Sequence, residues 1–181
     1  VYKRQIQNTM EKIKICEARR DDLEHLLELN QSNLPHVGSI TQSEMEYLHR
    51  QAIYFPVAEF NGQTAGFLIA FDPEADYNSL NFLWFKEHYP NFVYIDRIII
   101  AAEARRKGIA CFLYRDLENF AEERQIPLMA CEYNLRPKNN ISRQFHQRYG
   151  FNEVGTQETE NGKKTVSLQI KQVAPLRSST Q

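Results

Sequence analysis

Apolar and polar residues recur along the chain with periods that predict a succession of strands and helices. Isoleucines that alternate with polar residues predict a strand over Lys12–Glu17. Leucines at helical spacing predict a helix over Asp21–Leu34, which Pro35 ends. A second helix is predicted over Thr41–Gln51, because Glu44 stands three residues after the threonine, the spacing of a capping box.

Two Asn-Gly pairs, Asn61-Gly62 and Asn161-Gly162, predict two β-hairpins, because both residue types tolerate the left-handed backbone of a tight turn. The strands that they join are Ile53–Phe60 with Gln63–Phe71, and Glu153–Glu160 with Lys164–Ile170.

The middle of the chain alternates between strand and helix. A strand is predicted over Phe92–Ile100, a helix with one apolar face over Ile109–Arg124, and a second strand over Leu128–Tyr133. A strand, a crossover helix and a strand form a right-handed βαβ unit, whose two strands are parallel. Because the other strands are linked by hairpins, the predicted fold class is α+β with a mixed sheet.

The length of 181 residues suits one domain, which we expect over residues 12–171. We expect residues 1–11 to be an N-terminal extension, in which Met10 is a candidate natural start, and residues 172–181 to be a flexible tail. The net charge of −1 favours neither nucleic acid nor an anionic membrane as a partner. The three cysteines lack metal-ligand spacing, so we expect no metal site and reduced thiols in a cytoplasmic protein.

A basic turn, Arg105-Arg106-Lys107-Gly108, separates the predicted strand that ends at Ile100 from the predicted helix that begins at Ile109. Cations are unfavourable at a helix N-terminus, because unpaired N–H groups already present positive charge there. A docked anion would resolve this conflict, and a glycine would let the backbone approach it closely. The alternative is a solvated basic turn that ends the strand.

The pattern Arg105-x-x-Gly108-x-Ala110 resembles the pyrophosphate-binding loop of the GNAT acetyltransferase superfamily. The stretch from Asn134 to Phe151 resembles that family's second signature, in which an asparagine follows a strand and opens a helix that ends in Gly-Phe. These two motifs occur in the family's order, with a helix and a strand between them.

The pairing of Tyr94-Ile-Asp96-Arg97 with Phe145-His146 is similar to a little-characterised bacterial branch of predicted acetyltransferases. The resemblance implies a mixed, mostly antiparallel sheet with a central βαβ unit, splayed parallel strands and flanking helices. It also implies acetyl-CoA as the cofactor, with its pyrophosphate on the basic turn and its pantetheine along the strand before it. The implied cofactor-binding residues are Ile98, Ile99, Ile100, Arg105, Arg106, Lys107, Gly108, Ile109, Ala110, Asn134, Asn139, Ser142, Phe145 and His146.

Asp96 is a candidate catalytic residue. Strand alternation places it on the same face as Tyr94, and a carboxylate within a nearly apolar strand is costly unless it is paired or used. In several GNAT enzymes an acidic residue at the matching position orients or deprotonates the amine, a role that the resemblance implies for Asp96. The alternative is that Asp96 anchors a loop or pairs with a buried base.

His146 is the second candidate catalytic residue. It falls where many GNAT members have a tyrosine that protonates the departing CoA thiolate. A neutral histidine could orient the thiol, and a protonated one could act as the acid. The alternative is a surface histidine bonded to a nearby carbonyl. We expect Ile141, Phe145 and Tyr149 to form the apolar stripe of this helix.

The long connection Asp72–Asn91 combines aromatic and acidic residues, which suits a lid over a cationic amine. The alternative is a short helix that packs its aromatic side chains on the sheet. In the GNAT architecture the turn Leu34–Ile40 would form the opposite wall. The expected acceptor-binding residues are Asp96, Trp84, Phe85 and Tyr94.

These observations predict a cytoplasmic, acetyl-CoA-dependent N-acetyltransferase that acts on a small amine by direct attack in a ternary complex. One alternative is an enzyme of the same family that acetylates a protein N-terminus or lysine. A second alternative is a non-catalytic sensor of GNAT fold that binds acyl-CoA, which the ionisable pair Asp96 and His146 disfavours. The sequence leaves open whether the protein is a homodimer.

Overall fold

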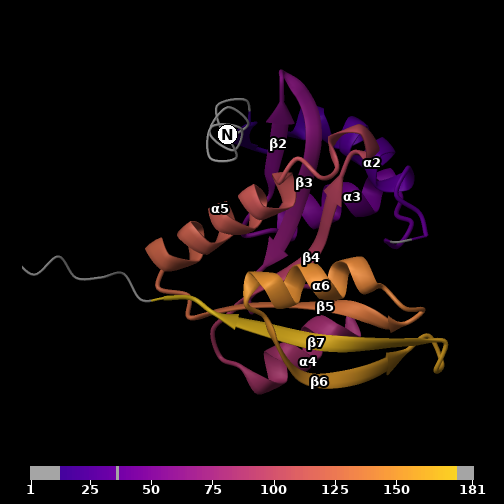
Figure 1. Cartoon of the computed structure of the whole chain (residues 1–181), viewed down its shortest axis with the longest axis vertical. Helices are drawn as coiled ribbons and strands as arrows, with labels where there is room; N and C mark the ends of the chain where they lie inside the picture. Colours follow the sequence, from indigo (N-terminus) through magenta and orange to yellow (C-terminus); the bar gives the residue numbers. More distant parts are fainter. Residues whose placement is uncertain (1–12, 36, 175–181) are drawn as a thin grey trace, which may run out of the picture. The chain divides into compact units, whose positions relative to one another are not determined.

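The computed structural model describes residues 13–35 and 37–174, so the predicted extension over residues 1–11, like residues 175–181 of the predicted tail, lies outside the described part (Figure 1). The elements in chain order are β1 (Ile13–Glu17), η1 (Arg20–Asp22), α2 (Leu23–Gln31), α3 (Gln42–Gln51), β2 (Pro56–Phe60), β3 (Gln63–Phe71), α4 (Leu80–His88), β4 (Val93–Ile100), η2 (Ala102–Ala104), α5 (Ile109–Glu123), β5 (Leu128–Arg136), α6 (Asn140–Tyr149), β6 (Asn152–Thr159) and β7 (Lys164–Gln172).

The described strands have the order β1-β2-β3-β4-β5-β7-β6 in a seven-stranded sheet. The β4–β5 pair is parallel, whereas the β1–β2, β2–β3, β5–β7 and β6–β7 pairs are antiparallel. This arrangement confirms the predicted α+β class with a mixed, mostly antiparallel sheet. The chain divides into two compact units, residues 1–70 with 96–116 (the first unit) and residues 71–95 with 117–181 (the second unit).

In the first unit, the predicted hairpin of β2 and β3 is present. Its turn residues Asn61 and Gly62 both have left-handed backbones, with φ of 54° and 76°, as the predicted tight turn requires. Phe55, just before β2, packs its ring 5.5 Å from that of Phe67 on β3 and 5.8 Å from that of His49 on α3. Aromatic contacts therefore attach α3 to this hairpin.

The predicted capping box of α3 is also present. Glu44 donates its backbone N–H to Thr41 Oγ1 over 3.2 Å, and the Glu44 carboxylate accepts from the Thr41 backbone N–H over 2.7 Å. The first helix is shorter than predicted, because α2 ends at Gln31. Ser32 Oγ and Asn33 Nδ2 both donate to the carbonyl of Leu29 over 2.8 Å, and such side-chain bonds compete with continuation of the helix.

The first unit also contains a close approach between β3 and β4. A Cβ atom at Gly66 would lie 2.4 Å from the Ile99 carbonyl oxygen and 2.8 Å from Ile100 Cδ1. The Ala101 backbone N–H donates to the Ala65 carbonyl over 2.9 Å. Only glycine therefore fits at position 66, and its missing side chain lets β4 lie against β3.

In the second unit, β4 pairs in parallel with β5 through Val93 with Met129 and Tyr94 with Ala130. The other edge of β5 pairs with β7, and β6 pairs with the far edge of β7, as the second predicted hairpin requires. Helices α4 and α6 cover opposite faces of these strands (Figure 1). Glu132 bonds to α4 and its neighbour Tyr133 stacks on α6, because successive residues of a strand point to opposite faces.

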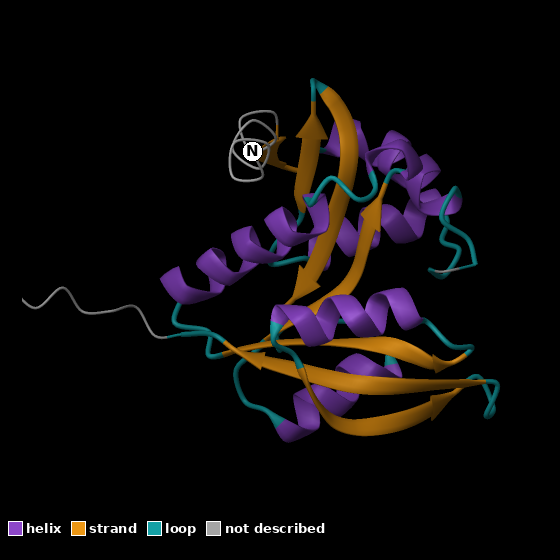
Figure 2. Ribbon diagram, viewed as in Figure 1, coloured by secondary structure: helices purple, strands orange, loops and turns teal. Residues whose placement is uncertain are grey.

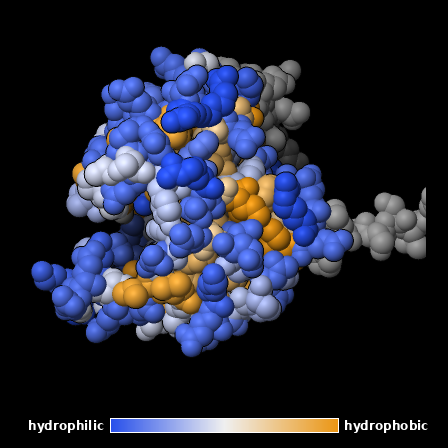
Figure 3. All heavy atoms as spheres, turned by 180° about the vertical axis from the view of Figure 1, so that it is seen from behind, coloured by the Kyte–Doolittle hydropathy of each residue, from blue (hydrophilic) through white to orange (hydrophobic). Residues whose placement is uncertain are grey.

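The long connection after β3 contains a helix, α4, rather than an irregular loop (Figure 2). Phe82 and Phe85 of this helix are fully buried, whereas Leu80 and Leu83 are exposed. The surface drawn in Figure 3 is mostly polar and contains separate apolar patches. Among the described residues, no helix is both long and apolar enough to span a membrane.

Candidate functional site

The basic turn before α5 has an unusual backbone in the first unit. Arg106 and Gly108 both have left-handed backbones, with φ of 61° and 80°. The buried residues Ala104 and Ile109 hold the two ends of the turn. Left-handed residues in a turn can direct backbone N–H groups into a concave anion-binding nest, and the following helix adds its own unpaired N–H groups. A Cβ atom at Gly108 would meet no described heavy atom within 4 Å, so the backbone there is open to a ligand.

Two of the three cations in this turn have defined partners. Arg105 Nη2 donates to Asn33 Oδ1 over 2.8 Å, and Lys107 Nζ lies 4.6 Å from the centre of the Phe60 ring. Arg105 and Lys107 are thereby fixed as two positive charges of this turn, which can help to neutralise a phosphate bound there. The turn therefore fits the pyrophosphate of a nucleotide cofactor.

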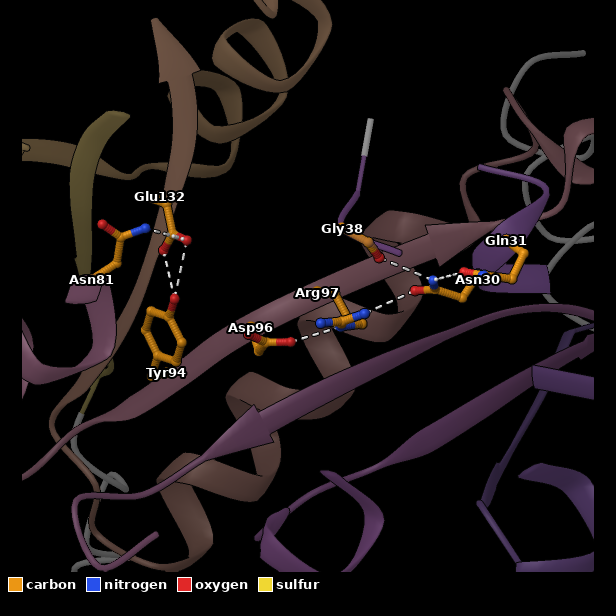
Figure 4. Close-up of polar contacts among 8 residues, drawn as sticks. All are labelled: Asn30, Gln31, Gly38, Asn81, Tyr94, Asp96, Arg97 and Glu132. Atoms are coloured by element: carbon orange, nitrogen blue, oxygen red, sulfur yellow. Dashed lines mark hydrogen bonds and ion pairs between the residues drawn. The ribbon is translucent and has the colours of Figure 1, made fainter. Parts of the chain in front are cut away.

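Asp96 lies in a buried chain of polar groups within the first unit (Figure 4). Arg97 Nε donates to Asp96 Oδ2 over 2.7 Å, and Arg97 Nη1 donates to Asn30 Oδ1 over 2.9 Å. The Arg97 side chain is 10% exposed and that of Asp96 is 7% exposed. Arg97 is therefore the buried basic residue with which Asp96 pairs, as one of the alternatives above expects. The Asp96 carboxylate lies on β4, the strand that leads to the basic turn.

A second cluster of hydrogen-bonded polar side chains, which the sequence did not predict, lies in the second unit (Figure 4). Tyr94 donates its hydroxyl to both carboxylate oxygens of Glu132, over 2.8 and 3.0 Å, and Asn81 Nδ2 donates to Glu132 Oε1 over 2.9 Å. Gln157 Nε2 donates to Asn81 Oδ1 over 2.9 Å, which fixes the amide of Asn81. The signal in the sequence is a single glutamate within the apolar β5 segment Met129–Tyr133.

His146 is buried on the α6 side of the second unit and is 4% exposed. Its Nδ1 donates to the Ser142 carbonyl over 2.8 Å, and its ring packs against those of Tyr133 and Phe151, at 5.8 and 5.2 Å. Burial lowers the pKa of His146 from its usual 6.5, although the hydrogen bond to Ser142 opposes that shift. The imidazole is therefore neutral near pH 7, with its proton on Nδ1.

The start of α6 is fixed by Asn139, whose Oδ1 accepts the Ser142 backbone N–H over 3.0 Å. The Asn139 backbone N–H donates to the Asn134 carbonyl over 3.1 Å. The prediction that Ile141 belongs to the apolar stripe is wrong, because Ile141 is 85% exposed. The buried face of α6 is centred on His146, since the ring contacts of His146 with β5 and Phe151 set the rotation of the helix.

The predicted acceptor residues around α4 lie mainly in the core of the second unit. Phe85 and Tyr94 are fully buried, with their rings 5.8 Å apart. Trp84 stacks on His88 at 3.9 Å and lies against Gly155, where a Cβ atom would be 3.3 Å from the indole. This packing corresponds to the alternative of a helix whose aromatics cover the sheet.

The predicted site residues are divided between the two units. The first unit contains Asp96, the strand residues Ile98–Ile100 and the turn Arg105–Ala110. The second unit contains Trp84, Phe85, Tyr94, Asn134, Asn139, Ser142, Phe145 and His146.

Comparison with known proteins assigns the chain to a family. Residues 20–151 match the model of the Acetyltransferase (GNAT) family, whereas no curated protein matches the chain. Among solved structures, Ard1 from Thermoplasma volcanium is 18% identical, with a TM-score of 0.72 over 90% of this chain and 99% of that chain. The ribosomal-protein-S18-alanine N-acetyltransferase from Escherichia coli is 15% identical, with a TM-score of 0.70 over 93% and 99%.

A third similar structure is NAA60 from Arabidopsis thaliana in complex with a bisubstrate analogue, at 14% identity and a TM-score of 0.69 over 88% of this chain and 97% of that chain. At these identities the likeness shows the fold alone, while the family match covers most of the chain. The chain belongs to the GNAT acetyltransferase family and is an N-acetyltransferase.

Proposed function

We propose that this protein transfers the acetyl group of acetyl-CoA to a small amine by direct attack in a ternary complex. The observation that carries the proposal is the basic turn directly before α5, in which Arg106 and Gly108 are left-handed, as in an anion-binding nest, and the backbone at Gly108 is open. Such a nest suits the pyrophosphate of CoA. When bound, acetyl-CoA supplies an activated thioester.

The strand before the turn is proposed to hold the rest of the cofactor. Backbone groups of Ile98 and Ile100 on β4 are expected to pair with the pantetheine amides as a neighbouring strand would. Gly66 supports this role, because it leaves no side chain between β3 and the backbone of Ile99 and Ile100. The chain thus contributes backbone amides and two anchored cations, Arg105 and Lys107.

Asp96 is proposed to orient the acceptor amine. An alkyl ammonium has a pKa of about 10.4 and must lose a proton before its nitrogen can attack. The Asp96 carboxylate can accept a hydrogen bond from this nitrogen and take up its proton, while Arg97 holds the carboxylate in place.

His146 is proposed to act as a neutral hydrogen-bonding group for the cofactor thiol. Because Nδ1 carries the proton that bonds to Ser142, Nε2 is the ring nitrogen with acceptor character. Its lowered pKa supports orientation of the thiol rather than proton donation near pH 7.

The acceptor class is tested with a panel of amines, amino acids and peptides, in which release of the CoA thiol is followed. We expect small amines to give turnover. Activity confined to peptides would favour the alternative of a protein or peptide N-acetyltransferase, a name carried by the similar enzyme from Escherichia coli. Binding of acetyl-CoA without turnover on any acceptor would contradict the proposal and favour the sensor.

A further inference from the structure

Two asparagines at the end of α2 each bind an arginine from the segment that carries the proposed site. Asn30 accepts from Arg97, and Asn33 accepts from Arg105, over 2.9 and 2.8 Å. Both asparagines are buried. Because Arg97 bonds to Asp96 and Arg105 begins the basic turn, the same helix end contacts the proposed acceptor group and the proposed cofactor loop.

Asn30 also holds the segment between α2 and α3. Its Nδ2 donates to the Gly38 carbonyl over 3.1 Å and to Gln31 Oε1 over 3.0 Å (Figure 4). Gln31 in turn donates to Ser39 Oγ over 2.9 Å and accepts from the Ile40 backbone N–H over 3.4 Å. A buried amide that is bonded at both ends cannot change partners without leaving a polar atom unsatisfied.

Arg97 also reaches the start of the next helix electrostatically. Hydrogen bonds from Thr41 lower the pKa of Glu44, and the positive charge of Arg97 lowers it further. Arg97 on β4 therefore bonds directly to Asn30 before the α2–α3 connection, and its charge has a minor effect on Glu44 after it.

We propose that Asn30 is a positioning residue that couples the Gly38–Ile40 segment to the Asp96 carboxylate through Arg97. Asn33 has the corresponding role for the basic turn through Arg105. The inference rests on the proposed function, in which Asp96 orients the acceptor and the turn holds the cofactor. A change in the Gly38–Ile40 segment then alters acceptor binding and leaves cofactor binding intact.

The kinetic test compares Asn30→Asp with the matched variant Asn33→Asp. Each aspartate keeps an oxygen that accepts from its arginine but loses the amide N–H donor. Asn30 donates to the Gly38 carbonyl, and Asn33 donates to the Leu29 carbonyl. Asn30→Asp loses both hydrogen bonds that Asn30 Nδ2 donates, to the Gly38 carbonyl and to Gln31 Oε1. It should raise the acceptor KM by about 10-fold or more and leave the acetyl-CoA Kd unchanged. Asn33→Asp should weaken acetyl-CoA binding and leave the acceptor KM unchanged at saturating cofactor. Equal effects of both variants on both constants would overturn the proposal.

A second measurement does not depend on activity. Amide hydrogen exchange at Ser39 and Ile40 should accelerate in Arg97→Lys, although the substitution lies on β4, and to a similar extent in Asn30→Asp. Unchanged exchange at these amides in both folded variants would disprove the coupling. A wild-type protein that shows no transfer with any acceptor would contradict the proposed function instead, while the exchange result would still decide the coupling.

Discussion

Individual side chains in this protein have their chemistry set by a few fixed partners, and His146 is the clearest case. Its ring is enclosed by Tyr133 and Phe151, and its Nδ1 is committed to the Ser142 carbonyl. Desolvation disfavours the charged imidazolium, which is why the pKa is lowered. The same burial links this residue to the stability of the fold.

The pH dependence of stability should report His146. Below pH 6.5, the ordinary pKa of histidine, the unfolded chain takes up a proton that the folded chain binds only at lower pH. The free energy of unfolding should therefore fall as the pH decreases from 6.5, and level off below the folded pKa. Denaturant unfolding of wild type and His146→Phe between pH 7.5 and pH 5 measures this. The difference between the two proteins should change over that range, and a constant difference would contradict the neutral, buried imidazole.

Gly108 and Gly62 offer a matched pair for testing the cofactor loop. Both have left-handed backbones, with φ of 80° and 76°, and both have open space where a Cβ atom would lie. Gly108→Val should weaken acetyl-CoA binding by about 10-fold or more, because a branched side chain obstructs the nest. Gly62→Val should cost similar stability and leave the Kd from calorimetry unchanged. Equal affinity in the two folded variants would remove the cofactor from this turn.

Asp96→Asn should lower turnover by about 100-fold and leave acetyl-CoA affinity nearly intact, because the amide keeps the shape of the side chain and loses its basicity. Steady-state kinetics with one good acceptor measures the loss. Glu132→Gln is the comparison, since Glu132 is a carboxylate held by the neutral donors Asn81 and Tyr94, whereas Asp96 is held by the cationic Arg97. Full activity of Asp96→Asn with a large loss in Glu132→Gln would assign the amine to Glu132.

At the scale of elements, the contact of β3 with β4 depends on a missing side chain. Position 66 faces backbone atoms of Ile99 and Ile100, which cannot rotate away as a flexible side chain could. The position of β4, the strand that is proposed to bind the pantetheine, therefore depends on Gly66 of the neighbouring strand β3.

Gly66→Ala should destabilise the protein by about 1–3 kcal/mol, the usual effect of overpacking a filled site. Chemical denaturation measures the change in unfolding free energy. Gly38→Ala is the control, because a Cβ atom at Gly38 would meet no described atom within 4 Å. A Gly66→Ala protein as stable as the control would show that β4 moves away freely.

Local signals in the sequence predicted most elements and the basic turn. The hairpins were predictable because Asn-Gly pairs encode their own turn geometry. The end of α2 was not, because Ser32 and Asn33 bond back to Leu29 in a way that helical periodicity does not reveal. The roles of Asn30 and Glu132 were also hidden, since their partners Arg97 and Tyr94 are 67 and 38 residues distant in the chain.

At the scale of the whole molecule, the residues that match the family model do not include every strand of the sheet. The matched residues, 20–151, exclude β1, β6 and β7. Nevertheless β7 pairs with both β5 and β6 along its length, so it is integral to the second unit. Hydrogen bonding between backbones holds these strands with little demand on sequence, which is consistent with a similar fold at 14–18% identity.

Acetyl-CoA should stabilise the folded protein by mass action. At a concentration of 100 times its Kd, a ligand that binds only the folded state adds about 2.7 kcal/mol. Thermal unfolding should therefore shift to higher temperature with acetyl-CoA, and Gly108→Val should need about 10-fold more ligand for the same shift. A wild-type melting temperature that does not respond to acetyl-CoA would contradict cofactor binding.

The backbone of Arg106 places stability and activity in opposition at one position. A left-handed conformation costs a residue with a side chain about 1 kcal/mol, a strain that glycine would relieve. A library randomised at position 106 and selected only for thermal resistance should accumulate glycine or asparagine. Selection of the same library for acetyl transfer should retain arginine, because glycine or asparagine removes one positive charge from the turn that is proposed to bind the phosphates. Directed evolution of this enzyme toward heat tolerance would therefore need to leave position 106 unchanged.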